Sequence, residues 1–110
     1  MTAKFIQTGE AIDYTPTSDV AAGAVVVQED LVGVAKLDIK SGKLGALHVT
    51  GVFEFPKETG GGKDIAAGKK VYWHPGDQVV KKTAAGATYL GKAAKAASEG
   101  DAKVRVRLEQ

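Results

Sequence analysis

The stretch that most constrains the fold of this 110-residue chain is residues 46–56, in which apolar and polar side chains alternate. The apolar set falls on one parity and the polar set on the other: Leu47, Val49, Phe53 and Phe55 against His48, Thr50 and Glu54. This period of two predicts a strand with one buried face. Gly51 falls on the apolar parity and predicts a bulge, a bend or a close backbone neighbour. Pro56 is expected to end the strand or to mark a sheet edge.

Similar short patterns recur along the chain and predict an all-β fold. Strands are expected within residues 10–15, 24–28, 31–37, 88–95 and 103–108, and the 14 glycines favour tight turns between them. In the last of these, the apolar parity is expected to face the core and the basic parity to face solvent: Val104, Val106 and Leu108 against Lys103, Arg105 and Arg107. We therefore predict a small single-domain β-barrel or sandwich over residues 1–110, with at most one or two short helical turns.

The two halves of the chain share a local pattern. Residues 19–23 read Asp-Val-Ala-Ala-Gly and residues 64–68 read Asp-Ile-Ala-Ala-Gly, each ahead of an expected strand, and Val32-Gly33 matches Leu90-Gly91. This pattern indicates an imperfect internal duplication or two uses of one local structure, with extra length at the turn expected around residues 73–77. The repeat favours a strand in 88–95 although its composition favours a helix. Each Asp-x-Ala-Ala-Gly segment could be a single helical turn that Asp begins and Gly ends.

Two segments are predicted to lie outside the packed strands. Residues 1–9 are expected to form an arm that is either loose or paired at a sheet edge, and residues 58–63, with three consecutive glycines, a mobile loop within the domain. Apolar side chains mark the arm and the residues after it, and they are our candidates for contact with a partner or a neighbouring subunit: Phe5, Ile6, Ile12 and Tyr14. The alternative is that residues 1–16 are simply the first strand of the domain.

The sequence carries no constellation typical of an enzyme or a cofactor site. There is no cysteine, so neither a disulfide nor a thiolate metal site can form. His48 and His74 fall on a polar parity and in an expected turn, where solvent-facing roles are more common than metal ligation. Gly62-Lys63 is followed by Asp64, where a phosphate-binding loop needs Ser or Thr. We therefore predict no catalysis, no cofactor, no metal and no small-molecule substrate.

Charge is distributed unevenly, since residues 1–55 carry a net charge of −3 and residues 56–110 a net charge of +5. Such asymmetry can steer one face toward an anionic partner, or it can reflect ordinary solvated strands. A basic stripe could bind nucleic acid, with Tyr72 and Trp73 as the stacking pair; its members would be Lys81, Lys82, Lys92, Lys95, Lys103, Arg105 and Arg107. We favour the alternative that Trp73 fills the core next to Phe53, which makes nucleic-acid binding the second hypothesis and an enzyme or accessory domain the third.

No segment has the properties of a membrane anchor or of a secretory leader. No apolar run approaches the ~20 residues of a membrane span, and the first residues lack the apolar core of a signal peptide. The expected place of synthesis is therefore a cytoplasm, and no membrane partner is predicted.

Read from end to end, the chain resembles the capsid cement, or head decoration, proteins of tailed phages and prophages, a family sometimes labelled as predicted phage recombinases. The resemblance is carried by the order of five short segments: residues 5–15, 30–35, 49–57, 68–73 and 100–108. It implies an all-β protein on the exterior of an icosahedral head, assembled in the host cytoplasm, that clamps capsomers against internal DNA pressure. It also implies the major capsid protein as partner, a homotrimer on the capsid and no catalysis. A recombinase would need an ATP site, which the glycine-lysine segments above do not provide.

Overall fold

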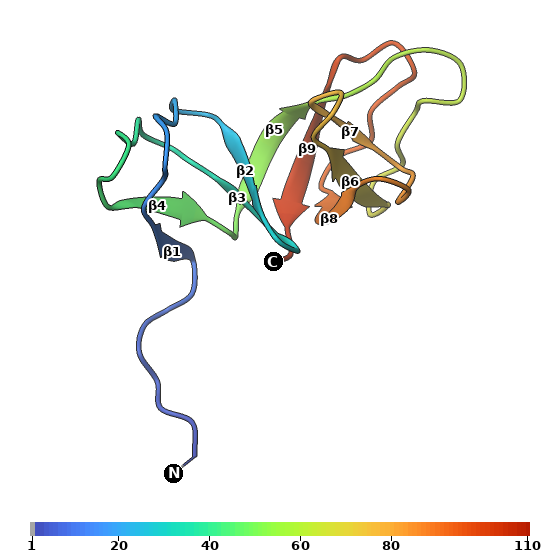
Figure 1. Ribbon diagram of the computed structural model, residues 1–110. Coiled ribbons are helices and arrows are strands. Elements are labelled where there is room, and N and C mark those ends of the chain that lie inside the picture. The colour runs from blue at the N-terminus through green and yellow to red at the C-terminus, as the bar shows by residue number, and fades with distance from the viewer. Residues whose placement is uncertain (1) are drawn as a thin grey trace.

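The computed structural model describes residues 2–110 and contains nine strands in two antiparallel sheets (Figure 1). The first sheet has the order β1-β4-β3-β2 and is built from β1 (Ala11–Tyr14), β2 (Val25–Gln28), β3 (Leu31–Val34) and β4 (Gly45–His48). The second has the order β5-β9-β8-β6-β7 and is built from β5 (Val52–Pro56), β6 (Lys70–His74), β7 (Val79–Lys81), β8 (Thr88–Ala93) and β9 (Lys103–Leu108). No helix occurs in residues 2–110, and the all-β prediction is confirmed.

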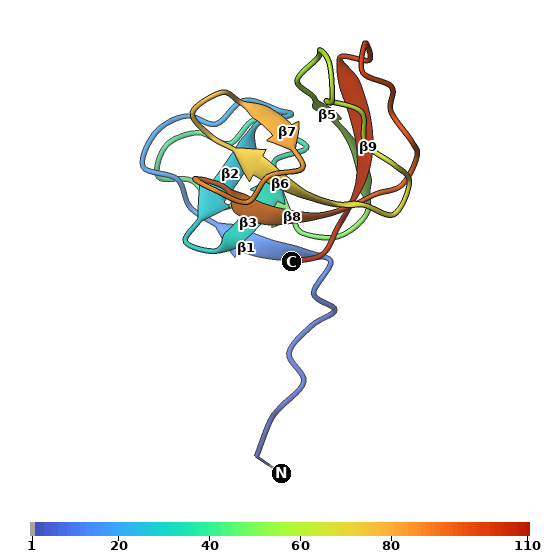
Figure 2. The same cartoon turned by 90° about the vertical axis from the view of Figure 1, so that its right-hand side faces the viewer.

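The five-stranded sheet curls until its two edges meet, and we call it the barrel. Lys57, the residue after β5, forms a parallel bridge with Val80 of β7. Closure satisfies edge groups that an open sheet would expose. Trp73 lies inside with 2% of its surface exposed, and its ring centroid is 6.1 Å from that of Phe55. Figure 2 shows β5 and β9 side by side along one wall of the barrel.

The prediction of one strand over residues 46–56 is wrong, because the stretch forms β4 and β5 in two different sheets. The chain bends between them at Gly51, whose φ of +103° is a conformation that L side chains rarely adopt. The alternation itself is correct: Leu47 and Phe55 are buried and Glu54 is exposed. However, Leu47 belongs to the small core of the first sheet and Phe55 to the core of the barrel. Apolar parity continues across the bend, so periodicity alone does not show the change of sheet.

The backbone repeats the same arrangement in both halves. Val20 N–H donates to the Ile39 carbonyl at 2.8 Å, and Ile65 N–H donates to the Ala97 carbonyl at 2.9 Å. The strand order β1-β4-β3-β2 corresponds to β5-β9-β8-β6, which leaves β7 as the addition of the second half. The turn at residues 75–78 connects β6 to β7, where the sequence places the extra length.

The Asp-x-Ala-Ala-Gly segments are not helical turns, and that prediction is wrong. Each forms an isolated bridge followed by a turn. In the first copy the groups that would cap a helix bond elsewhere: Ser41 N–H donates to the Asp19 carboxylate at 2.9 Å, and Ala22 N–H donates to the Asp38 carboxylate at 2.8 Å. These long-range partners replace the local cap on which the helical prediction depended.

β3 joins the two sheets. Its Val32 and Val34 are buried in the core of the barrel, whereas Ala35, just after the strand, belongs to the smaller core with Ile39 and Leu47. The side chain of Gln110 links β3 to β8, because it accepts a hydrogen bond from Val32 N–H at 2.7 Å and donates one to the Leu90 carbonyl at 2.8 Å.

Candidate interaction surfaces

The N-terminal arm, residues 2–10, lies outside the strands and projects from the body ahead of β1 (Figures 1 and 2). Phe5 and Ile6 on this arm expose 77% and 76% of their surface. Exposed single apolar residues are common, but two adjacent ones on a segment outside the fold present an apolar patch that no other part of residues 2–110 covers.

The other two predicted contact residues lie elsewhere. Ile12 and Tyr14 are half-buried on β1 and pack against the small core of the first sheet. Ile12 lies directly opposite Leu47 of β4. β1 pairs only with β4 and is therefore an edge of its sheet in the described chain. The structure thus separates an exposed pair, Phe5 and Ile6, from a pair that helps to hold the edge strand in place.

A second apolar surface was not anticipated from the sequence. Leu37 and Leu44 expose 78% and 70% of their surface beside a hollow of about 580 Å³ formed by residues 36–40 and by residues around β4. Leu37 falls at the end of the segment expected as a strand, and β3 ends three residues earlier at Val34. No periodic signal in the sequence distinguishes this exposed leucine from a buried one.

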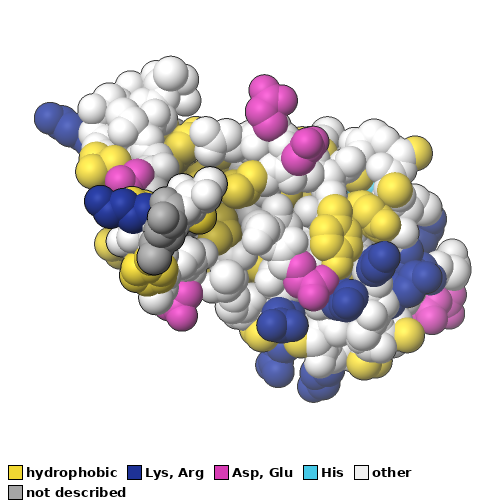
Figure 3. Space-filling model, turned by 90° about the horizontal axis from the view of Figure 1, so that it is seen from below, with side chains coloured by type: hydrophobic (Ala, Val, Ile, Leu, Met, Phe, Trp, Pro, Cys, Tyr) yellow, Lys and Arg dark blue, Asp and Glu magenta, His cyan; other side chains and the backbone are white. Residues whose placement is uncertain are grey.

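The outer face of the barrel is basic. Lys70 of β6 lies directly opposite Lys92 of β8, and Lys92 lies directly opposite Arg107 of β9. Further along β9, Arg105 and Lys103 are also exposed. Figure 3 looks at the side from which the arm projects and shows Lys and Arg side chains gathered over the barrel half. The alternation predicted for residues 103–108 is therefore confirmed, with its basic parity on this face.

The Glu109 carboxylate pairs with two cations of this face. Its Oε2 lies 3.8 Å from Lys92 Nζ and 3.9 Å from Arg107 Nη1, and its Oε1 accepts a hydrogen bond from the Tyr89 hydroxyl. The Tyr89 hydrogen bond, followed by the charges of Lys92 and Arg107, lowers the pKa of Glu109. Burial, followed by the hydrogen bond to Glu109, raises the pKa of Tyr89 to about 12. Both groups therefore keep their usual charge at neutral pH.

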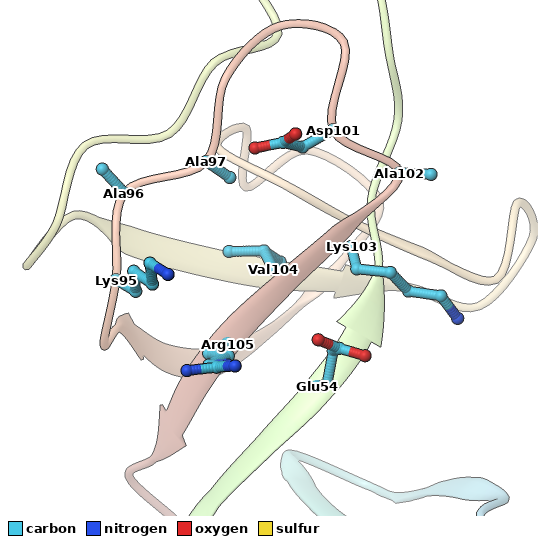
Figure 4. A pocket seen from close by; sticks show the side chains of 9 residues that line it. All are labelled: Glu54, Lys95, Ala96, Ala97, Asp101, Ala102, Lys103, Val104 and Arg105. Atoms are coloured by element: carbon cyan, nitrogen blue, oxygen red, sulfur yellow. The ribbon is translucent and has the colours of Figure 1, made fainter.

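A hollow of about 300 Å³ lies beside β9, and Figure 4 shows its lining. Glu54 and Arg105 project from neighbouring strands, while Lys95 and Asp101 come from the segment between β8 and β9. Ser98 N–H donates to the Asp101 carboxylate at 2.8 Å, and this bond is the main cause of the lowered pKa of Asp101. The carboxylate therefore has a local structural role, because it stabilises the turn ahead of β9.

Of the two residues proposed for base stacking, Trp73 is buried and Tyr72 is half-buried. Trp73 is buried, as we favoured, although its aromatic neighbour is Phe55; the Phe53 ring lies 6.4 Å from that of Phe55. Tyr72 packs edge-to-face against Tyr89 with their centroids 5.7 Å apart. The basic face therefore offers two half-buried rings that contact each other, and the Trp73 indole is not part of it.

The two histidines and the glycine loop have structural contacts. His74 Nε2 lies 2.8 Å from the Thr83 carbonyl, and His48 is half-buried on β4. Lys63 of the glycine loop pairs with Glu58 at 2.9 Å. Within residues 2–110, no group of three or more His, Cys, Asp or Glu is placed to hold a metal ion. The same residues include no helix long and apolar enough to cross a membrane.

Comparison with known proteins assigns the chain to a family. The family model described as phage cement protein matches residues 6–108, which is nearly the whole chain. No curated protein and no solved structure matches the chain. The match includes both sheets and the end of the arm, and it agrees with the resemblance carried by the five sequence segments. This chain belongs to the phage cement protein family, and its role is the structural decoration of a phage capsid.

Proposed function

We propose that the chain binds the major capsid protein on the exterior of a phage head, as a homotrimer and without catalysis, after synthesis in the host cytoplasm. In this proposal residues 1–110 act as one domain, and the arm makes the first contact with the capsid. The observation that carries the proposal is the exposed pair Phe5 and Ile6, on a segment outside the strands of a cement-family chain.

The energetics of the arm indicate how it would bind. Burying Phe5 and Ile6 gains about 1.5–3 kcal/mol each, whereas ordering each arm residue costs about 1–2 kcal/mol. Two apolar side chains therefore do not offset the ordering of residues 2–9, and main-chain hydrogen bonds must contribute. Adding a strand to an exposed sheet edge supplies such bonds. We propose that the arm pairs with an edge of the capsid protein or of a neighbouring subunit, and that Ile12 and Tyr14 fix its starting point on β1.

The test is binding to expanded, undecorated heads by co-sedimentation. A variant without residues 2–9 is expected to keep its thermal midpoint, because those residues lie outside both cores, and to bind at least about tenfold more weakly. The double variant Phe5→Ser/Ile6→Ser should reproduce most of this loss. The matched control Lys4→Ser/Gln7→Ser changes the same arm without its apolar pair and should bind normally. Unchanged binding of the folded truncation would contradict the role of the arm.

The oligomer has its own measurement. Analytical ultracentrifugation of the free protein, together with the ratio of bound chain to capsid subunits, would distinguish a trimer formed in solution from one formed on the head. Bound copies in groups of three support the proposal. A saturated ratio that no arrangement of trimers can satisfy would contradict it.

A further inference from the structure

We infer that the basic outer face of the barrel is a docking surface for a carboxylate-rich protein surface on the capsid. The face is defined by the exposed side chains Lys70, Lys92, Lys95, Lys103, Arg105 and Arg107. The inference rests on the proposed function and deepens it, because it names a second contact besides the arm and the chemistry of the partner that fits it.

The strongest reason is the register of the cations. Lys70, Lys92 and Arg107 lie side by side on β6, β8 and β9, each directly opposite the next. Like charges in directly opposite positions destabilise a sheet. Strand spacing of about 4.8 Å places three cations within roughly 10 Å. In the free protein Glu109 offsets only part of this repulsion, whereas a partner that supplies further carboxylates converts the rest into attraction.

Ion pairs elsewhere on the barrel show the contrast. Lys81 Nζ lies 2.6 Å from Asp77 and 3.7 Å from Glu58, and Glu58 also pairs with Lys63 at 2.9 Å, so that two carboxylates balance two cations. On the basic face one carboxylate pairs with two cations, since Lys92 and Arg107 share Glu109 at 3.8 and 3.9 Å. The remaining four cations of the face form no ion pair within 4.0 Å among residues 2–110. Glu54 of β5 lies directly opposite Arg105, and the six cations still exceed Glu54 and Glu109, so this face has a local excess of positive charge.

The chemistry of the face favours a protein partner over nucleic acid. Arginine guanidinium groups bind carboxylates and phosphates alike in a bidentate geometry, so the exposed Arg105 and Arg107 of β9 fit either anion and the stacking groups decide between the partners. Base stacking has only a limited platform here, because Trp73 is buried and the half-buried rings of Tyr72 and Tyr89 pack edge-to-face against each other. Figures 1 and 3 together show Lys and Arg side chains of the barrel half on the side from which the arm projects. The arm and these charges can therefore approach one surface at the same time.

The experiment compares charge reversals on matched exposed cations by binding to expanded, undecorated heads. Arg105→Glu and Arg107→Glu change the face, and Lys43→Glu changes an exposed lysine of the other half as the control. We expect the wild type to lose at least about tenfold in affinity between low and high salt, because the Debye screening length falls to a few ångströms at high salt. The double reversal should bind at least about tenfold more weakly at low salt and lose most of the salt dependence, whereas the control should stay within about twofold.

The other outcomes separate the two proposals. If the wild type does not bind heads at all, the proposed function fails. If the wild type binds and the double reversal binds equally well at every salt concentration, the docking face fails and the proposed function stands. Arg105→Gln/Arg107→Gln, which removes charge without adding any, gives the same test if the reversal does not fold. Equal affinity of the wild type for duplex DNA and for heads, with both lost in the double reversal, would assign the face to nucleic acid instead.

Discussion

Adding one methyl group at Gly91 is expected to destabilise the barrel by about 2–6 kcal/mol. Gly91 lies in β8 opposite Leu108 of β9, and a Cβ atom there would stand 2.0 Å from the Arg107 carbonyl oxygen. Ordinary contact begins at 3.4 Å, so the backbones would have to separate by about 1.4 Å. Such a shift costs about 1–3 kcal/mol as overpacking. It also disrupts the 3.1 Å hydrogen bond from Glu109 N–H to the Leu90 carbonyl, at about 1–3 kcal/mol for buried groups left unpaired.

Chemical denaturation measures this loss of unfolding free energy, provided that the variant and the wild type have equal m-values. In thermal unfolding the midpoint should fall by about 10–20 °C. Two other glycines provide the controls. A Cβ at Gly33 would meet Leu47 Cβ at 2.8 Å, so Gly33→Ala should cost about 1–3 kcal/mol. Gly76 has nothing within 4 Å, and Gly76→Ala should stay within about 0.5 kcal/mol of the wild type. If Gly91→Ala also stays within that range, the close approach of β8 to β9 is refuted.

Three further predictions concern charge, packing and pH. Lys70→Thr removes the cation opposite Lys92 and should stabilise the free protein by about 0.2–1 kcal/mol in a urea titration. The same variant should bind heads more weakly. A stability equal to or below that of the wild type would contradict the repulsion between Lys70 and Lys92. Trp73→Ala should lower the free energy of unfolding by about 3–5 kcal/mol. Trp73→Phe should lower it clearly less, because the buried Nε1 of Trp73 has no acceptor among residues 2–110 and no hydrogen bond is lost. Equal losses in the two variants would refute this reasoning. The lowered pKa of Asp101 contributes stability above about pH 4, and this stability disappears as the pH falls. Asp101→Asn should therefore lower the free energy of unfolding at pH 7 but not at about pH 2. A difference that does not depend on pH would contradict the role of the ionised carboxylate as acceptor from Ser98 N–H.

Much of the fold could be predicted from local patterns. Residues 103–108 alternate cleanly because β9 lies between β5 and β8 in a closed sheet, where every second side chain must face the core. The repeated Val32-Gly33 and Leu90-Gly91 pairs identify β8 as a strand in spite of its helical composition. In each case a local sequence feature reports a constraint that the fold imposes at the same position.

The remaining features depend on long-range partners. The same apolar parity continues through Gly51 from one sheet into the other, so the separation of β4 from β5 is invisible without their partners, β1 and β9. The cation row is hidden for the same reason. Lys70, Lys92 and Arg107 are far apart in sequence, and only the register of β6, β8 and β9 brings them together. The exposed pair on the arm, in contrast, could be predicted because it precedes the first strand.

If this chain stabilises a phage capsid, its binding to heads must raise their thermal survival, and both can be measured in one experiment. Purified protein would be added to expanded, undecorated heads, the bound fraction measured by co-sedimentation, and the temperature of DNA release recorded with and without it. We expect saturable binding in fixed proportion to capsid subunits and a higher release temperature. A folded protein that does not saturate the heads, or that saturates them without raising the release temperature, would contradict it.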